Sequence, residues 1–325
     1  MLLHYFNADN DMALANGEPG YTPPASIRRM MQEKALLPAC WAQPGDGVLT
    51  EQGVWVVERP PQRVGMWTEQ PGMGEGHYVP LHEVLPRVTE VRPWGWSPAA
   101  CHRLQAMGIP PALLPDASQL AEIRRLSSRE RAVELLPRLV ALDDRLCGES
   151  LFCRDMTAVC QALAQWSRTI LKAPWSGSGK GLRYGQGGRE DTLMGWCRRI
   201  LEGQGGVVVE PLYDKQHDLA MEFWSDAQGS VQYRGLSLFE THPNGAYAGN
   251  RLWTEEEKVG WLLQRVEEDL FHTLRTALEE RLCELIGTAY QGPLGVDMMY
   301  LGKGTLHPCV EINLRMTMGY AAILC

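Results

Sequence analysis

The chain has 325 residues, of which 45% are hydrophobic and 22% are charged, and its formal net charge is −8. This length predicts about two domains, and the composition excludes the disordered, collagen-like and disulfide-stapled classes of protein. No apolar run is long enough to span a bilayer, and the acidic balance argues against a broad nucleic-acid-binding surface.

The cysteines and the first residues favour a reducing compartment. The nine cysteines form no CxxC pair and are odd in number, which suits free thiols better than disulfides or a zinc site. The first residues, MLLHYFNADND, reach acidic side chains too early for a signal peptide. We therefore expect a cytoplasmic protein, and an enzyme, that binds neither membranes nor nucleic acid.

Residues 1–120 are predicted to form a small N-terminal α/β domain. They are rich in proline, glycine and tryptophan, and GEPGYTPPAS and VRPWGWSP are typical of turns. Short apolar runs at 2–6, 53–58 and 90–91 predict strands between these turns.

The remaining chain is predicted to divide into a helical linker with a glycine-rich-loop subdomain at 121–205 and a C-terminal subdomain at 206–325. Helical patterning extends from Ala117 to about Ala164. Apolar runs that predict strands then follow at 170–173, 206–212, 219–224, 230–238, 294–301 and 306–314. One long helix interrupts them: Thr254 and Glu257 form a capping box, and apolar residues recur every three or four positions from Val259 to Leu285.

The first candidate site is Ile170-Leu-Lys-Ala-Pro-Trp-Ser-Gly-Ser-Gly-Lys-Gly-Leu-Arg183. Its pattern is that of a strand ending at Lys172, a loop of small residues at 176–181 and a second strand. Small residues let backbone N–H groups converge on an anion, and Lys180 adds a positive charge. The loop is not a Walker A loop, because Pro174 stands in place of its first glycine. A hairpin tip that carries a solvated lysine fits the pattern equally well.

The second candidate site is Val207-Val-Val-Glu-Pro-Leu-Tyr-Asp214. Three β-branched residues predict a strand, and Pro211 ends its ladder because proline has no N–H to donate. Such a strand exposes backbone groups suited to the edge of a purine, and Glu210 can accept a hydrogen bond from an exocyclic amine. An edge strand that simply enters a loop is the alternative.

The third candidate site combines Gly295-Val-Asp-Met-Met299 with His307-Pro-Cys-Val-Glu-Ile-Asn-Leu-Arg-Met-Thr317. Strand alternation places an acid, an amide and a guanidinium on one face and three apolar residues on the other: Glu311, Asn313 and Arg315 against Val310, Ile312 and Leu314. Oxygen ligands suit Mg²⁺, and Asp297 is costly to bury among apolar neighbours without a cation or donor. The alternative is a half-exposed strand with solvated charges.

The order of the three sites resembles the ATP-grasp superfamily of carboxylate–amine and carboxylate–thiol ligases. That family has a lysine-ended strand, a glycine-rich loop, a strand ending in glutamate, an aspartate and a final E-x-N-x-R. The matches are Lys172, the 176–181 loop, Glu210, Asp297 and EINLR at 311–315. The resemblance covers 150–325 well and the first 120 residues loosely. It implies an α/β (α+β) fold in which two α/β subdomains clamp ATP, preceded by a small N-terminal α/β domain.

The resemblance also implies roles for individual residues. Those that would bind ATP are Lys172, Ser176, Gly177, Ser178, Gly179, Lys180, Glu210, Pro211, Leu212 and Asp218. Those that would hold one or two Mg²⁺ ions, with Mn²⁺ as an alternative, are Asp297, Glu311 and Asn313. Those that would act on the reacting groups are Arg315, Lys180 and Arg251.

Two features depart from the family pattern. Many members have a lysine upstream of a G-[IL]-P turn, whereas this chain has Ser97-Pro-Ala-Ala before Gly108-Ile-Pro110, so Arg129 is the candidate replacement. Some ligases have an arginine two residues before the metal aspartate, where this chain has Gly295; Arg234 or Arg251 is the candidate there.

These features predict an ATP- and Mg²⁺-dependent ligase that activates a carboxylate as an acyl phosphate and joins it to an amine, with release of ADP. The expected partners are ATP, an unidentified small-molecule or peptide carboxylate and an amine acceptor; a homodimer is compatible with the sequence. A kinase of ATP-grasp type and a degenerate nucleotide-binding protein stay open as alternatives. The polar segment His4 to Asp11 either contacts substrate or forms a turn.

Overall fold

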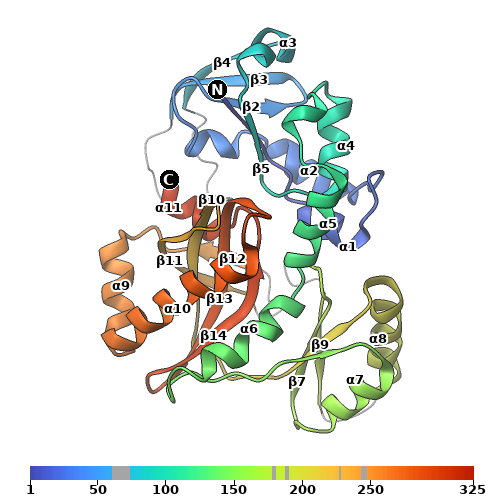
Figure 1. Cartoon of the computed structure of the whole chain (residues 1–325), viewed down its shortest axis with the longest axis vertical. Helices are drawn as coiled ribbons and strands as arrows, with labels where there is room; N and C mark the ends of the chain where they lie inside the picture. Colours follow the sequence, from blue (N-terminus) through green and yellow to red (C-terminus); the bar gives the residue numbers. More distant parts are fainter. Residues whose placement is uncertain (61–73, 178–180, 187–189, 227, 243–246) are drawn as a thin grey trace.

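Strands from the two ends and the middle of the chain form three separate sheets (Figure 1). The computed structural model describes residues 1–60, 74–177, 181–186, 190–226, 228–242 and 247–325. The strands are β1 Leu2–Tyr5, β2 Gly47–Thr50, β3 Gly53–Arg59, β4 Glu75–Val79, β5 Glu90–Pro93, β6 Leu151–Cys153, β7 Thr169–Lys172, β8 Leu182–Gly185, β9 Val207–Pro211, β10 His217–Asp226, β11 Val231–Thr241, β12 Tyr247–Asn250, β13 Gln291–Gly302 and β14 Thr305–Asn313.

Helices connect and cover these sheets. The α-helices are α1 Asn10–Asn16, α2 Ala25–Glu33, α3 Leu81–Val84, α4 Pro98–Ala106, α5 Ala117–Leu126, α6 Glu130–Val140, α7 Met156–Leu163, α8 Asp191–Gln204, α9 Glu255–Leu263, α10 Glu268–Ile286 and α11 Met318–Leu324. Short 3₁₀ turns lie at Leu37–Cys40, Leu85–Arg87 and Pro111–Leu113. Among the described residues, no helix is long and apolar enough to cross a membrane.

The first sheet has the order β4-β3-β2-β1-β5, and β1 runs parallel to both β2 and β5. The strands predicted at 2–6, 53–58 and 90–91 are confirmed as β1, β3 and β5, whereas the short strands β2 and β4 were not expected. Because β1 and β5 are parallel, their carboxyl ends lie at the same edge of the sheet. The segments after them therefore meet: Asn7 Nδ2 donates to the carbonyl oxygen of Gly95 over 2.8 Å.

The second sheet has the order β6-β9-β7-β8 and is antiparallel throughout. Helices α7 and α8 cover one of its faces, where Val159, Leu193 and Trp196 pack on Leu171 and Val209. The strand β6 interrupts the segment that helical patterning predicted from Ala117 onward; its three residues are too few to show a period of two. The opposite face of this sheet carries the polar ends of β7 and β9.

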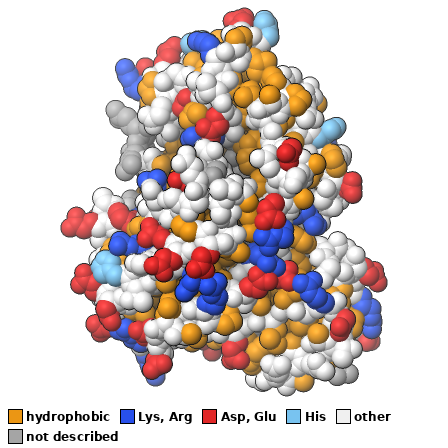
Figure 2. Space-filling model, viewed as in Figure 1, with side chains coloured by type: hydrophobic (Ala, Val, Ile, Leu, Met, Phe, Trp, Pro, Cys, Tyr) orange, Lys and Arg blue, Asp and Glu red, His pale blue; other side chains and the backbone are white. Residues whose placement is uncertain are grey.

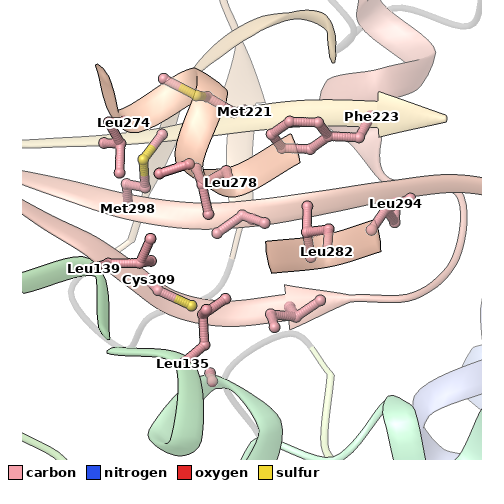
Figure 3. Packing of buried hydrophobic residues seen from close by; sticks show 14 of the residues in the cluster. Leu135, Leu139, Met221, Phe223, Leu274, Leu278, Leu282, Leu294, Met298 and Cys309 are labelled. Atoms are coloured by element: carbon pink, nitrogen blue, oxygen red, sulfur yellow. The ribbon is translucent and has the colours of Figure 1, made fainter. Parts of the chain in front are cut away.

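The third sheet is antiparallel with the order β12-β11-β10-β13-β14. One face forms the largest core of the protein, where apolar residues of α6, α9 and α10 pack on every second residue of the strands. Figure 3 shows Leu274, Leu278 and Leu282 of α10 beside Met221 and Met298 of the sheet. The alternation leaves the other face free for polar side chains.

The prediction of one long helix from Thr254 onward is wrong in one respect, because the segment forms two helices, α9 and α10. The capping box is confirmed, since Thr254 Oγ1 accepts from the Glu257 N–H over 3.3 Å and Glu257 caps in return. The helix then ends near Leu263, where the Arg265 guanidinium donates to the Trp261 carbonyl oxygen over 2.7 Å and satisfies a group that a continuing helix would use. Leu262, Val266 and Leu270 still reach the same core, as the apolar stripe predicted.

The expected facing of β14 is confirmed for Ile312 and Leu314, which are buried in the core, but not for Val310. The pairing of β13 with β14 shifts between Asp297/Glu311 and Met299/His307, so that β14 bulges. Pro308 lies in this bulge of the edge strand β14, and both a bulge and an edge strand accommodate a residue without an N–H. The bulge breaks strict alternation, and Val310 consequently lines the polar face.

Candidate active site

A cavity of about 1940 Å³ lies between the polar faces of the second and third sheets and the carboxyl edge of β1. This volume is about twice the upper end of ordinary small-molecule sites, so it has room for more than one ligand. The predicted site residues that line it are Lys172, Ser176, Gly177, Glu210, Pro211, Leu212, Asp218, Asp297, Glu311, Asn313 and Arg315. The structure thus brings together side chains from all three candidate sites.

On the second sheet, Lys172 and Glu210 form a buried ion pair. Lys172 Nζ lies 2.6 Å from Glu210 Oε2, and the two side chains are only 6% and 4% exposed. The pairing of β7 with β9 places both on the same face, and Ser150 Oγ donates to Glu210 Oε1 over 3.0 Å. Each charge is therefore neutralised inside the protein, which a buried charge requires.

Residues that follow β9 form one wall of the cavity. Pro211 and Leu212 line it, together with Tyr213. The N–H of Leu212 is not free as the sequence suggested, because it donates to the carbonyl oxygen of Arg168 over 2.9 Å. Next along the wall, Asp218 Oδ2 accepts from Lys215 Nζ over 2.6 Å and from Thr241 Oγ1 over 2.8 Å.

Arg129 joins the small-residue loop to the third sheet. Its guanidinium donates to Ser176 Oγ over 2.7 Å and to the Ala173 carbonyl oxygen over 2.6 Å, and it lies 2.8 Å from Glu311 Oε1. The Arg129 side chain is 7% exposed and lines the cavity. Ser178, Gly179 and Lys180 lie outside the described residues.

Asp297 and Glu311 face one another directly on the neighbouring strands β13 and β14. Asn313 Nδ2 donates to Asp297 Oδ2 over 3.1 Å. Burial, and then the negative charge of Glu311, raise the pKa of Asp297 to about 7. The two carboxylates are hard ligands that suit a divalent cation, which would relieve this repulsion. The Asn313 amide oxygen, a further hard ligand, accepts from Arg315 Nη2 over 2.9 Å. Among the described residues, no three His, Cys, Asp or Glu side chains form such a group, so Asn313 is needed to complete the set.

The N-terminal segment after β1 contributes an acid to the same place. Arg315 donates from Nε to Asp11 Oδ1 over 2.7 Å and from Nη2 to Asp11 Oδ2 over 2.8 Å. A Cβ on Gly177 would lie 2.7 Å from Asp11 Oδ2, so the loop also passes close to this carboxylate. Asp9, two residues earlier, pairs in the same two-point manner with Arg103 of α4. Asp9 thus holds the segment to α4, and Asp11 holds it to the residues that follow β14.

Arg251, predicted to act on the reacting groups, lies away from the lining formed by the described residues. Its guanidinium is 3.4 Å from Glu240 Oε1 and 4.9 Å from the ring of Trp253. Arg234, the other candidate, donates to Gln232 Oε1 over 3.2 Å. The roles of Arg234 and Arg251 remain predictions.

Sequence reasoning missed Glu222 of β10. This side chain lines the cavity and is 1% exposed, and burial, and then the charge of Asp297, raise its pKa to about 8. The signal was available, because Ala220-Met-Glu-Phe-Trp224 has one acid among apolar residues, as GVDMM does.

The face of the molecule drawn in Figure 2 has mixed charge. Figure 2 shows acidic and basic side chains side by side across this face of the molecule. Such mixing differs from the basic stripe of a protein that tracks nucleic acid.

No protein-family model and no curated protein matches the sequence. Solved structures do match. A D-alanyl-alanine synthetase A from Vibrio cholerae shares 13% identity, with 98% of this chain and 89% of that one covered and a TM-score of 0.50. A biotin carboxylase from Campylobacter jejuni, in complex with β-γ-ATP, shares 15% identity over 75% of this chain and 52% of that one, also with a TM-score of 0.50.

An N5-carboxyaminoimidazole synthetase from Staphylococcus aureus in complex with ADP matches with a TM-score of 0.44 and 15% identity, over 72% of this chain and 56% of that one. The chain thus spans about half the length of this synthetase and of the biotin carboxylase. The two structures with the higher scores confirm the fold expected from the sequence: the chain has the ATP-grasp fold.

Proposed function

We propose that the protein is an ATP- and Mg²⁺-dependent ligase that converts a carboxylate into an acyl phosphate and joins it to an amine. The observation that carries the proposal is the direct pairing of Asp297 with Glu311 inside a cavity that also contains the buried Lys172. Phosphoryl transfer from ATP requires groups that neutralise charge, and it needs no nucleophile from the protein.

We infer that the nucleotide lies along β10, with its base beside Glu210 to Leu212 and its ribose near Asp218. Ala220, two residues further, pairs with Asp297, so the phosphates would lie beside the acidic pair. Lys172, and Lys180 from the loop, would contact the phosphates, with Ser176 to Gly179 supplying backbone donors. The biotin carboxylase with the same fold was solved with an ATP ligand, which supports a nucleotide in this cavity.

We propose that Asp297, Glu311 and Asn313 hold Mg²⁺ when it is bound. The facing carboxylates and the raised pKa of Asp297 fit such an ion, because a bound cation favours the charged forms. The ion would neutralise charge on the phosphates. Arg129 would take the place of the missing upstream lysine, since it already joins Ser176 to Glu311.

In the proposed reaction, a carboxylate oxygen of the substrate attacks the γ-phosphorus and ADP leaves. The amine then attacks the acyl carbon, phosphate leaves and the amine proton is released, which yields the amide. Arg315, held by Asp11, would face the transferring phosphoryl group. Arg251 is proposed as a further contact to substrate; alanine there should raise the substrate KM, and unchanged kinetics would remove it from the site.

Product analysis tests the proposal. The full chain is incubated with MgATP, a panel of carboxylic acids and hydroxylamine, a small amine that traps acyl phosphates as hydroxamates. We expect ADP, phosphate and a hydroxamate in equal amounts with at least one acid. A phosphorylated product without free phosphate would instead identify a kinase, and the absence of any MgATP-dependent product across the panel would overturn the ligase.

A further inference from the structure

Glu222 lies on β10, two residues beyond Ala220, the residue that pairs with Asp297. Asp218, Ala220 and Glu222 share the cavity face of this strand, and Ala220 pairs with Asp297 while Glu222 pairs with Gly295. Since a strand rises roughly 3.3 Å per residue, Glu222 is about 7 Å further than Ala220 from the end that holds Asp218. If the phosphates lie beside Asp297, as proposed above, Glu222 lies past their far end.

Glu222 is a buried acidic side chain with one unpaired oxygen. Its Oε2 has no hydrogen-bond partner among the described residues, and it forms no ion pair with them. Burial and the charge of Asp297 raise the pKa of Glu222. The Thr317 hydroxyl and the charges of Arg315 and Lys258 lower it, but by less. A buried oxygen without a hydrogen-bond partner is costly, so its surroundings favour the arrival of a hydrogen-bond donor with positive charge.

Two glycines make room for this carboxyl group, whose oxygens pack directly against their backbones. A Cβ on Gly319 would lie 2.1 Å from Glu222 Oε1 and 2.4 Å from Ser237 Oγ, and a Cβ on Gly295 would lie 2.5 Å from Glu222 Oε2. Any larger residue at either position would displace the carboxylate.

The neighbouring polar groups accept hydrogen bonds. Ser237 Oγ donates its proton to Asn250 Oδ1 over 2.9 Å, which leaves its lone pairs as acceptors. The Tyr247 hydroxyl also lines the cavity and has no hydrogen-bond partner among the described residues. Carboxyl, serine and tyrosine oxygens therefore line the same cavity, and those of Glu222 and Ser237 are neighbours beside Gly319.

We propose that Glu222, with Ser237 and Tyr247, forms a subsite for the ammonium group of the acceptor substrate. An ammonium group has three N–H donors and a compact positive charge, which matches three oxygen acceptors and favours the ionised form of the Glu222 side chain. The subsite selects a cationic acceptor over a neutral one, and its identification as the acceptor site rests on the function proposed above.

Binding of two small probes to the full chain tests the subsite. Glycinamide and glycolamide differ only in an ammonium against a hydroxyl group, and their affinities are measured by NMR titration without nucleotide. Because hydrogen bonds to a charged partner are the strong ones, we expect the protein to prefer glycinamide by about tenfold. The Glu222→Gln variant should lose this preference, whereas Glu280→Gln, at an exposed position on α10, should keep it.

A second variant covers the case in which Glu222→Gln fails to fold. Gly319→Ala places a methyl group against the carboxylate and should weaken glycinamide binding by about tenfold. Equal affinity for the two probes, no binding of glycinamide, or a preference that survives in both variants would overturn the subsite. Binding of a non-hydrolysable ATP analogue is measured separately, so that loss of nucleotide binding, which would overturn the proposed function, is distinguished from loss of the amine preference.

Discussion

Asp11 and Arg315, 304 positions apart in the chain, form a two-point ion pair at the edge of the cavity. Asp11 lies in α1, the helix that follows β1, and Arg315 follows β14, the last strand of the third sheet. The pair therefore ties the N-terminal sheet to the strand that carries Glu311 and Asn313.

Replacing Asp11 by Asn should destabilise the protein. The two side chains are 23% and 17% exposed, so the change leaves a largely buried guanidinium without its acid and should lower the free energy of unfolding by roughly 2–4 kcal/mol. Urea denaturation measures the loss. Asp214→Asn is the matched control, because its pair with Arg168 is 86% and 56% exposed and should contribute less than about 1 kcal/mol. Equal losses in the two variants would contradict the structural role of Asp11.

The pair between Lys172 and Glu210 allows stability to be separated from nucleotide binding. Lys172→Met alone leaves Glu210 charged and buried, and should lower the free energy of unfolding by roughly 3–5 kcal/mol. Adding Glu210→Gln should restore most of that stability, but not the affinity for a non-hydrolysable ATP analogue. Denaturation and calorimetry measure the two quantities. A double variant that binds nucleotide as the unaltered protein does would remove Lys172 from the site.

Much of the site could be predicted because its signals are local. A lone acid in an apolar strand marked Asp297, and alternation put Ile312 and Leu314 in the core. The same reasoning would have found Glu222. The pair of Asp11 with Arg315 could not be predicted, because no pattern within a segment relates residues so far apart. The bulge at Pro308 and the break after Leu263 also depend on neighbours outside the segment.

Asp297 should make the metal-free protein less stable as pH rises. Its pKa is raised to about 7 in the folded protein, whereas in the unfolded chain it has its ordinary, lower value. Between about pH 4 and pH 7 the folded state therefore binds more protons, and the free energy of unfolding falls as pH rises. Asp297→Asn should remove this part of the pH dependence. Urea denaturation of both proteins in EDTA across this range measures the difference, and parallel pH profiles would contradict it.

His307 should have the opposite effect at low pH. It is fully buried beside Tyr213, and burial, and then the charge of Lys172, lower its pKa to about 3. Its neutral form stabilises the fold above the ordinary pKa of histidine, and this contribution is lost as pH falls toward about 3. His307→Phe should be less sensitive to acid than the unaltered protein between about pH 6 and pH 3. Acid-denaturation midpoints that do not differ would show that His307 does not titrate in this way.

The most direct test of the account is calorimetric binding of a non-hydrolysable ATP analogue, with and without Mg²⁺, to the unaltered protein and to Asp297→Asn/Glu311→Gln. Because the paired carboxylates are the proposed metal ligands, Mg²⁺ should strengthen binding to the unaltered protein by about tenfold or more and should have little effect on the double variant. Equal Mg²⁺ dependence in the two proteins, or no nucleotide binding by either, would contradict the central claim that this cavity holds Mg²⁺ and ATP.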